Sequence, residues 1–316
     1  MITVSNSRLK TWKNNHYDHY MKYVKRLVPK AKAGPLIRGN MIHECLEAYY
    51  NGKSWTKTLD RLEAEYHKNT FAEERAQMGD IPKMARELLE AYFLFYEEED
   101  ADTEYLENEL HFKLPLTEEI EIEGYIDAVI KDPEGKIWVK DYKTYKSMKD
   151  YSFFHLNTQS AIYIWAMEQL GYEVQGVIWD VIKAKEPSKP QILKSGKLSS
   201  RRLDSTPYTV EKGILELGLN PEDYQDFIDS HRYEDFFVRH AVRLNRTSVD
   251  FLMADVEETA LQILERGDTT RDMNLGGPFK SPYMEIWEAE ALGLDTEFII
   301  KRNFETRERR PHDEKK

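Results

Sequence analysis

Residues 120–146 constrain the fold more than any other stretch, because they have the pattern of two β-strands joined by a tight turn. Over 120–130, apolar residues alternate with acidic or polar ones at the two-residue period of a half-buried strand. The turn at 132–135, DPEG, contains only turn-forming residue types, and a second strand runs from about Ile137 to Lys143. We therefore expect a β-hairpin around which the rest of the chain is organised.

The predicted hairpin carries acidic and basic side chains that can share one face of a sheet. Residues two apart on a strand point to the same side, so Asp141 and Lys143 share a face. If the strands pair antiparallel, Asp127 can lie near Asp141. Two carboxylates and an ammonium group so arranged can hold a hard divalent cation and activate water beside it. Taken alone, the same pattern is more typical of a solvated hairpin with ordinary surface charges.

The spacing of these charges resembles the PD-(D/E)XK nuclease superfamily. Asp127 matches the first acid of the family motif, and Asp141-Tyr142-Lys143 matches its (D/E)-x-K element, with Asp in place of Glu. The resemblance implies an α/β fold with a restriction-endonuclease-like core, in which helices flank a mixed central sheet. We also expect large helical segments outside that core.

Two helical motifs extend the resemblance to the RecB-like group of these nucleases. A G-x-x-x-H motif ends at His43 in a predicted amphipathic helix over 37–50, and a Q-x-x-x-Y motif runs from Gln159 to Tyr163 in a predicted helix over 155–170. Either motif alone would indicate a surface histidine or an unremarkable helix. All the elements occur in the family's order, which favours the nuclease interpretation and a likeness to phage-type and CRISPR-adaptation-type exonucleases.

The resemblance also implies a domain layout. We expect one nuclease domain over 1–300, with its core at about 37–185, helical N- and C-terminal segments packed together, and a tail over 301–316.

Periodicity predicts further elements outside the motifs. These are helices at 5–27, 57–99 (with breaks near Gly79 and Pro82) and 221–266 and strands at 104–116 and 173–183.

The implied activity is that of a metal-dependent DNA exonuclease, phage-encoded, that works in DNA recombination, replication or repair. Its expected partners are DNA and recombination or replication proteins. The expected ligands of Mg²⁺ or Mn²⁺ are His43, Asp127, Asp141 and the backbone carbonyl of Tyr142. The expected catalytic residues are Lys143, Asp127, Asp141, Gln159 and Tyr163. Within this set Lys143 would position the attacking water, and Gln159 and Tyr163 would orient Lys143 or the DNA backbone.

The cysteine content departs from many of these relatives, which hold a 4Fe–4S cluster on four cysteines. This chain has one cysteine, Cys45, and other residues stand at the corresponding positions. These residues are Asn15, Asn274, Gly277 and Tyr283. None of them can ligate iron as thiolate does, so we expect no iron–sulfur cluster. Packing or hydrogen bonding through Phe279, Tyr283 and Trp287 would then join the N- and C-terminal segments.

Charge is distributed unevenly along the chain, whose formal net charge is −12. An acidic body argues against a protein that coats DNA but allows a locally basic catalytic cleft. Two basic segments, 22–38 and 184–208, are candidates to contact phosphate if they flank that cleft. Each is equally compatible with an ordinary basic surface loop.

The sequence leaves the cellular setting and two competing functions open. No apolar run approaches 18 residues, and 1–13 has no apolar segment of signal-peptide type. We therefore expect no membrane span and a cytoplasmic location, in the host cell if the protein is phage-encoded. One competing interpretation is a catalytically weak nuclease-fold protein that binds DNA or acts as a scaffold. The other is a metal-dependent enzyme that acts on something other than nucleic acid.

Overall fold

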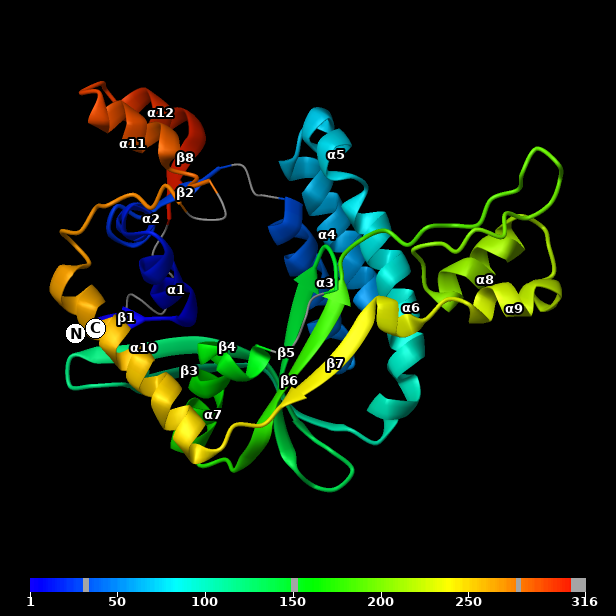
Figure 1. Cartoon of the computed structure of the whole chain (residues 1–316), viewed down its shortest axis with the longest axis horizontal. Helices are drawn as coiled ribbons and strands as arrows, with labels where there is room; N and C mark the ends of the chain where they lie inside the picture. Colours follow the sequence, from blue (N-terminus) through cyan, green and yellow to red (C-terminus); the bar gives the residue numbers. More distant parts are fainter. Residues whose placement is uncertain (31–33, 149–152, 277–279, 308–316) are drawn as a thin grey trace.

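A six-stranded mixed sheet organises the computed structural model, which describes residues 1–30, 34–148, 153–276 and 280–307 (Figure 1). The strands run in the order β1-β4-β5-β6-β7, and β3 pairs separately with β4. Their bounds are β1 (Ile2–Val4), β3 (Glu104–Pro115), β4 (Ile120–Lys131), β5 (Ile137–Tyr145), β6 (Val174–Lys183) and β7 (Phe237–Val242). The β1–β4 and β5–β6 pairs are parallel and the others antiparallel. The predicted mixed α/β fold is confirmed, and the sheet extends beyond 37–185 to β1 and β7.

The predicted hairpin is strands β4 and β5, and its two strands separate where the acidic residues stand. Their ladder runs from Lys131 opposite Ile137 to Ala128 opposite Lys140. Farther back along β4, Ile120–Ile122 pairs with β1 instead of β5. The two strands therefore diverge beyond Ala128, and we call this point the fork.

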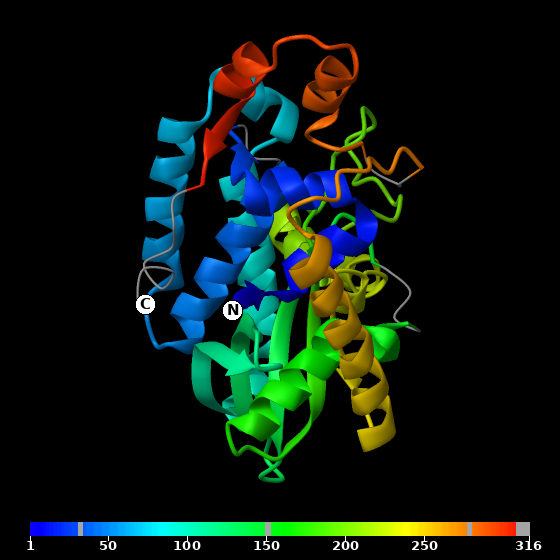
Figure 2. The same ribbon diagram turned by 90° about the vertical axis from the view of Figure 1, so that its left-hand side faces the viewer.

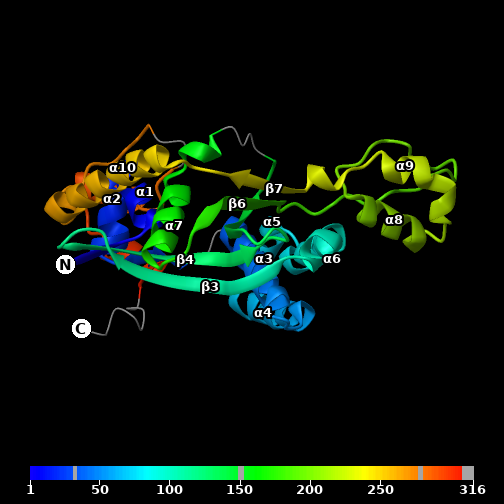
Figure 3. The ribbon, with the colours of Figure 1, turned by 90° about the horizontal axis from the view of Figure 1, so that it is seen from below.

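Helices cover both faces of the sheet, on the two sides of β5 and β6 in Figures 1 and 3. One face packs against α1 (Asn6–Asn14), α7 (Thr158–Gln169) and α10 (Arg246–Arg266), which contribute to one core cluster. The other packs against α3 (Gly34–Tyr50) and α6 (Ile81–Ala101), backed by α4 (Trp55–Asn69) and α5 (Ala72–Met78). The helical stretch predicted at 57–99 is thus three helices, and the breaks predicted near Gly79 and Pro82 fall where α5 ends and α6 begins. None of the described helices is long and apolar enough to cross a bilayer.

The two ends of the chain pack together, as Figure 2 shows for the red C-terminal and blue N-terminal segments. The predicted helix at 5–27 breaks at Asn15 into α1 and α2 (His16–His19), which a π-helical turn (Tyr20–Val24) continues. Strand β2 (Leu27–Pro29) pairs antiparallel with β8 (Phe304–Thr306). Helices α11 (Met284–Ala291) and α12 (Glu297–Asn303) complete this part. Residues 301–306, predicted as tail, therefore belong to α12 and β8.

The connection between β6 and β7 forms an extension beside α6 (Figure 1). It contains α8 (Pro207–Glu216) and α9 (Gln225–Asp229), which share a small apolar cluster of Val210, Ile214 and Ile228. The prediction of helix throughout 221–266 is wrong at β7. There the pairing with β6 and the burial of Phe237 override the helical pattern.

Candidate active site

The predicted acidic residues and lysine stand together at the fork. Asp141 is almost completely buried, and its Oδ2 forms an ion pair with Nζ of Lys143 on the same face of β5. Across the fork, Oδ2 of Asp127 accepts a hydrogen bond of 2.8 Å from the backbone amide of Tyr142. The Tyr142 ring is buried on the opposite face, because alternate residues of a strand point to opposite sides. The diverging strands thus place two carboxylates and one ammonium group in one small region.

Helix α7 presents the predicted glutamine and tyrosine to the same carboxylate. Asn157 caps this helix by accepting a hydrogen bond from the Gln159 amide, which sets the position of its first turn. One turn apart on the helix, Gln159 Nε2 and the Tyr163 hydroxyl both donate to Oδ1 of Asp141, at 3.0 and 2.9 Å. The Tyr163 hydroxyl also lies 3.0 Å from the Tyr125 carbonyl of β4, where β4 has left β5. Asp141 is therefore held from two elements.

Helix α3 brings His43 to the other carboxylate. Nδ1 of His43 lies 3.6 Å from Oδ2 of Asp127. The helix can approach β5 closely because Gly39 has no side chain, and a Cβ there would lie 3.1 Å from the Thr144 hydroxyl oxygen. The structure therefore brings all the sequence-predicted site residues, from β4, β5, α3 and α7, together at the fork.

The electrostatics of the fork follow from burial and from two neighbouring carboxylates. Burial, and then the negative charge of Asp141, raise the pKa of Asp127 well above its ordinary range. Burial alone would lower the pKa of Lys143, but the Asp141 carboxylate outweighs it and raises that pKa. Burial lowers the pKa of His43 to about 4, so its imidazole is neutral near pH 7. Lys143 is therefore a cation and His43 a potential metal ligand.

The donor set suits a hard divalent cation. Two carboxylates and a neutral imidazole face one another with a single ammonium group, and the raised pKa of Asp127 shows that its negative charge is poorly compensated. Carboxylate oxygens are preferred ligands of Mg²⁺, and Mn²⁺ also accepts imidazole. Within the described ranges, no three His, Cys, Asp or Glu side chains are already arranged to hold a metal ion.

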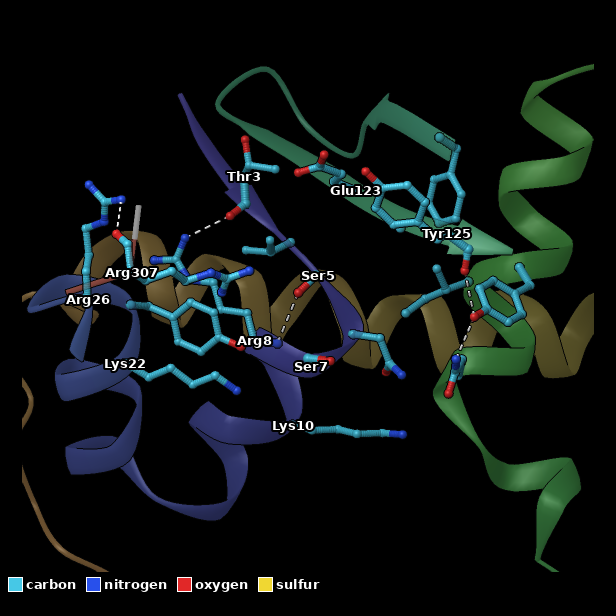
Figure 4. Close-up of a pocket in the computed structure, with 18 of the residues that line it drawn as sticks. Thr3, Ser5, Ser7, Arg8, Lys10, Lys22, Arg26, Glu123, Tyr125 and Arg307 are labelled. Carbon is cyan, nitrogen blue, oxygen red and sulfur yellow. Dashed lines mark hydrogen bonds between the residues drawn. The ribbon is translucent and has the colours of Figure 1, made fainter. Parts of the chain in front are cut away.

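A pocket of about 820 Å³ extends from the fork to the N-terminal segment, and we call it the N-terminal pocket. Figure 4 shows Arg8, Lys10 and Lys22 on one wall, facing Glu123 and Tyr125 of β4. Lys143, Gln159 and Tyr163 line it as well. Most of these wall residues were not predicted from the sequence, because β1 and α1 lie more than a hundred residues from β4 in the chain. The one available indication was the basic segment that begins at Lys22.

The two predicted basic segments have different surroundings. Of 22–38, Lys22 and Arg26 line the N-terminal pocket, whereas Lys30 and Arg38 donate to the backbone carbonyls of Lys301 and Met78. Lys32 lies outside the described residues. In 184–208, several bases are paired with acids instead of lining the pocket. These pairs are Lys185 with Asp204, Lys189 with Glu216 and Arg202 with Asp235.

A second polar cluster, which the sequence did not reveal, lies on the opposite face of the sheet. Lys140 and Asp180 are buried and form an ion pair of 3.1 Å. Arg239 of β7 donates to Asp180 at 3.0 Å and to Asp100 of α6 at 2.7 Å. The Tyr92 hydroxyl donates to Asp180 at 2.6 Å. This buried ionic cluster joins α6 to the three strands β5, β6 and β7.

Polar contacts and packing join the chain ends around Asn15, Asn274 and Tyr283, three positions at which the sequence resemblance would imply cysteine and this chain has none. Asn15 lies 3.1 Å from the Met273 sulfur, and Asn274 donates to the Asn14 carbonyl at 2.9 Å. The Tyr283 hydroxyl donates to the Leu27 carbonyl at 2.8 Å, and its ring stacks on Phe304. Trp287 packs against the same cluster. Gly277, the fourth of these positions, and Phe279, predicted to pack there, lie outside the described residues.

Comparisons with known proteins found a matching family model and several similar proteins. The family model described as "PD-(D/E)XK nuclease superfamily" matches residues 3–257. The chain is similar to a subunit of the "ATP-dependent helicase/deoxyribonuclease" of Streptococcus mutans, at 23% identity over 272 residues, which are 80% of this chain and 24% of that protein. The protein of the same name from Streptococcus pyogenes serotype M49 is 24% identical over 187 residues, 54% of this chain and 17% of its own length.

Among solved structures, a putative exonuclease from Eubacterium rectale matches with a TM-score of 0.38 and 14% identity, covering 77% of this chain and 86% of that one. The chain spans less than a quarter of the length of the two streptococcal proteins.

Proposed function

Since the chain belongs to the PD-(D/E)XK nuclease superfamily, we propose that it is a divalent-metal-dependent deoxyribonuclease. One observation carries this proposal: at the fork, the carboxylates of Asp127 and Asp141 stand beside Lys143, with His43 3.6 Å from Asp127. Phosphodiester hydrolysis needs a bound cation, an oriented water and positive charge near the phosphate. The residues at the fork can meet all three needs.

The proposed ligands of the cation are Asp127, Asp141, His43 and the backbone carbonyl of Tyr142, and the proposed ion is Mg²⁺ or Mn²⁺. When bound, the ion would lower the pKa of a coordinated water and offset negative charge on the phosphate. The low pKa of His43 keeps its imidazole available as a donor near neutral pH. The hydrogen bond from the Tyr142 amide fixes Asp127 on one side of the site.

Lys143 acts as a cation and not as a general base in this proposal, because Asp141 raises its pKa. Its ammonium group positions the attacking water and stabilises the charge that develops on the phosphate. Gln159 and Tyr163 act through Asp141, whose Oδ1 they both contact. As positioning residues, they hold the Asp141 carboxylate where it contacts Lys143 and where it would also bind the cation.

The finer assignment is an exonuclease that works in DNA recombination, replication or repair. The name of the streptococcal relatives, which joins a helicase to a deoxyribonuclease, supports a DNA substrate and a helicase as a partner. Recombination or replication proteins as partners stay a prediction from the sequence resemblance. We also propose that one nuclease domain spans 1–300 and holds no iron–sulfur cluster, since Asn15, Asn274 and Tyr283 make polar or packing contacts where thiolates would be needed. A phage origin stays a prediction from the sequence resemblance.

The decisive experiment compares linear end-labelled DNA with covalently closed circular DNA, each as single and double strands. An exonuclease releases mononucleotides or short products from the linear DNA in Mg²⁺ or Mn²⁺, leaves the circles intact and is inactive in EDTA. Cleavage of the circles would instead identify an endonuclease. Binding without any cleavage in either metal would contradict the proposal and favour the catalytically weak, DNA-binding interpretation.

A further inference from the structure

The N-terminal pocket has a charge opposite to that of the chain as a whole. Its wall has six basic side chains and one acidic side chain, in a protein whose formal net charge is −12. The acid, Glu123, already accepts from His111 at 2.8 Å. The basic side chains are Arg8, Lys10, Lys22, Arg26, Lys143 and Arg307. Such a wall attracts an anion.

Of these bases, Lys143 alone forms an ion pair in the part of the chain that the structure describes, and Lys10 and Lys22 are among the five that form none. Lys10 forms no ion pair there, and burial together with the charge of Lys143 lowers the pKa of Lys10. Lys22 lies over the ring of Tyr23, 5.2 Å from its centroid, and also forms no ion pair. On α1, Lys13 lies outside the pocket and pairs with Asp255. Lys10 is exposed and Lys22 is half-buried, so both ammonium groups are accessible to an anion in the pocket.

The shape and position of the pocket indicate which anion it takes. Its volume of about 820 Å³ lies within the range of pockets that enclose a ligand, about 300–1,000 Å³. One end is Lys143 and Gln159 at the fork. The N-terminus of α1, capped by Ser5, lies on the wall, and its helix dipole favours negative charge. A chain of phosphates that reaches the fork would continue along this wall.

We propose that Lys10 and Lys22 form a phosphate-binding subsite for the DNA strand whose phosphodiester bond lies at Lys143. The proposal rests on the proposed function, because that function brings a nucleic-acid strand to the fork. The phosphate held there is either a neighbouring internal phosphodiester or the phosphate at a strand end. The N-terminal segment thus contributes substrate contacts from outside the family motifs, across the pocket from β4.

The experiment measures DNA binding without cleavage, with fluorescein-labelled single strands in EDTA. The double variant Lys10→Ala/Lys22→Ala is compared with the control Lys13→Ala/Lys25→Ala. The control removes the same amount of charge from the same N-terminal segment, but neither of its lysines lines the pocket. Lys25 instead lies over the ring of Tyr20. For single strands, each lost phosphate contact reduces the magnitude of the negative slope of log K against log[salt] by about 0.7. Loss of two contacts in the pocket variant should therefore reduce that magnitude by about 1.4. The control pair should keep the slope of the unmodified protein.

Three probes separate the sources of the phosphate: a linear strand with a 5′-phosphate, one with a 5′-hydroxyl, and a closed circle. An equal loss on all three supports internal phosphates, and a loss confined to the 5′-phosphate strand supports a terminal one. Lys10→Arg/Lys22→Arg should restore binding, and matching melting curves exclude a folding defect. A pocket variant that binds all three probes like the control overturns the proposal.

The two proposals fail in different ways. Unmodified protein that binds DNA but never cleaves it in Mn²⁺ ends the nuclease assignment and leaves the subsite standing. Normal cleavage and binding by the Lys10→Ala/Lys22→Ala variant ends the subsite and leaves the nuclease assignment standing.

Discussion

The backbone amide of Tyr142 donates a hydrogen bond of 2.8 Å to Oδ2 of Asp127, beyond the last paired residues of β4 and β5. Where two strands separate, their backbone groups lose ladder partners and need others. Here a carboxylate satisfies the amide of β5, and the Tyr163 hydroxyl reaches the Tyr125 carbonyl of β4. The same divergence that opens the sheet therefore fixes the side chains of the candidate site.

The charge of Lys143 is the first target for a test. Lys143→Gln removes the ammonium group but keeps a donor that can reach Asp141. We expect the cleavage rate to fall by about 100- to 1,000-fold, the usual cost of removing one electrostatic stabiliser of a transition state. Single-turnover assays in Mn²⁺ measure this, with cooperative melting as the check on folding. Lys131→Gln, on the exposed part of β4, is the matched control. Unchanged turnover in Lys143→Gln would end the assignment.

Metal binding at the fork should depend on Asp141. Asp141→Asn keeps the side-chain shape and retains an oxygen for Gln159 and Tyr163, but it removes the negative charge that a hard cation requires. We expect the heat of Mn²⁺ binding in calorimetry to disappear or weaken strongly. Asp132→Asn in the exposed turn of the hairpin loses the same charge away from the fork and should bind Mn²⁺ normally. Equal Mn²⁺ heats in both variants would remove Asp141 from the ligand set.

The central part of the site was predictable because its pattern is local. The two-residue alternation on β4 and the D-x-K spacing on β5 put Asp127, Asp141 and Lys143 on one hairpin before any long-range contact is considered. The helical motifs of His43 and Gln159 added residues by resemblance, and the folded chain brings them to the same carboxylates.

Other features depend on contacts that are distant in sequence, and the sequence alone did not reveal them. Strand β1 has three residues, too few for a periodic pattern, yet its pairing with β4 positions Arg8 and Lys10 at the pocket. Lys140 looks like a solvated strand residue, because nothing local shows that Asp180 and Arg239 will meet it. Strand β7 was predicted as helix because its apolar residues allow either period.

The sheet at β4 should be sensitive to volume at Gly124. A Cβ at this position would lie 2.5 Å from the ring of Phe112 on β3, closer than carbon atoms approach. Gly124→Ala should therefore lower the free energy of unfolding by about 1–3 kcal/mol, the usual cost of overpacking. Urea denaturation measures the loss. Combining it with Phe112→Leu, which trims the facing side chain, should recover part of the stability, and no recovery would show that the strain lies elsewhere.

The buried ionic cluster should be costly to break from one side. Arg239→Met keeps much of the side-chain volume but leaves Asp180 and Asp100 without their shared guanidinium partner. Removing one member of a buried ion pair typically costs about 3–5 kcal/mol. We expect a loss of that size in urea unfolding. Arg246→Met, whose ion pairs are exposed, should cost less than about 1 kcal/mol. Similar losses of unfolding free energy in the two variants would show that burial does not increase the contribution of this cluster to stability.

His19 should make the protein sensitive to mild acid. Its ring is completely buried, and its Nε2 accepts a hydrogen bond of 3.1 Å from Nε of Arg8, which requires a neutral imidazole. Burial, then the charges of Arg8 and His16, lower its pKa from 6.5 to about 3. As the pH falls through 6.5, the unfolded chain takes up a proton on the His19 imidazole, whereas in the folded chain this imidazole stays neutral down to about pH 3. The stabilisation is therefore complete above pH 6.5 and declines as the pH falls toward 3, by about 2 kcal/mol between pH 7 and 5.

The measurement for His19 is the free energy of unfolding in urea at pH 7, 6 and 5. His19→Gln should flatten the pH dependence by about 2 kcal/mol relative to the unmodified protein, because glutamine takes up no proton in either state. His67→Gln serves as the control, since His67 is exposed, pairs with Glu63 and is not among the groups that shift the pKa of His19. If the difference between the unmodified protein and His19→Gln is the same at all three pH values, the buried imidazole does not contribute to the acid sensitivity.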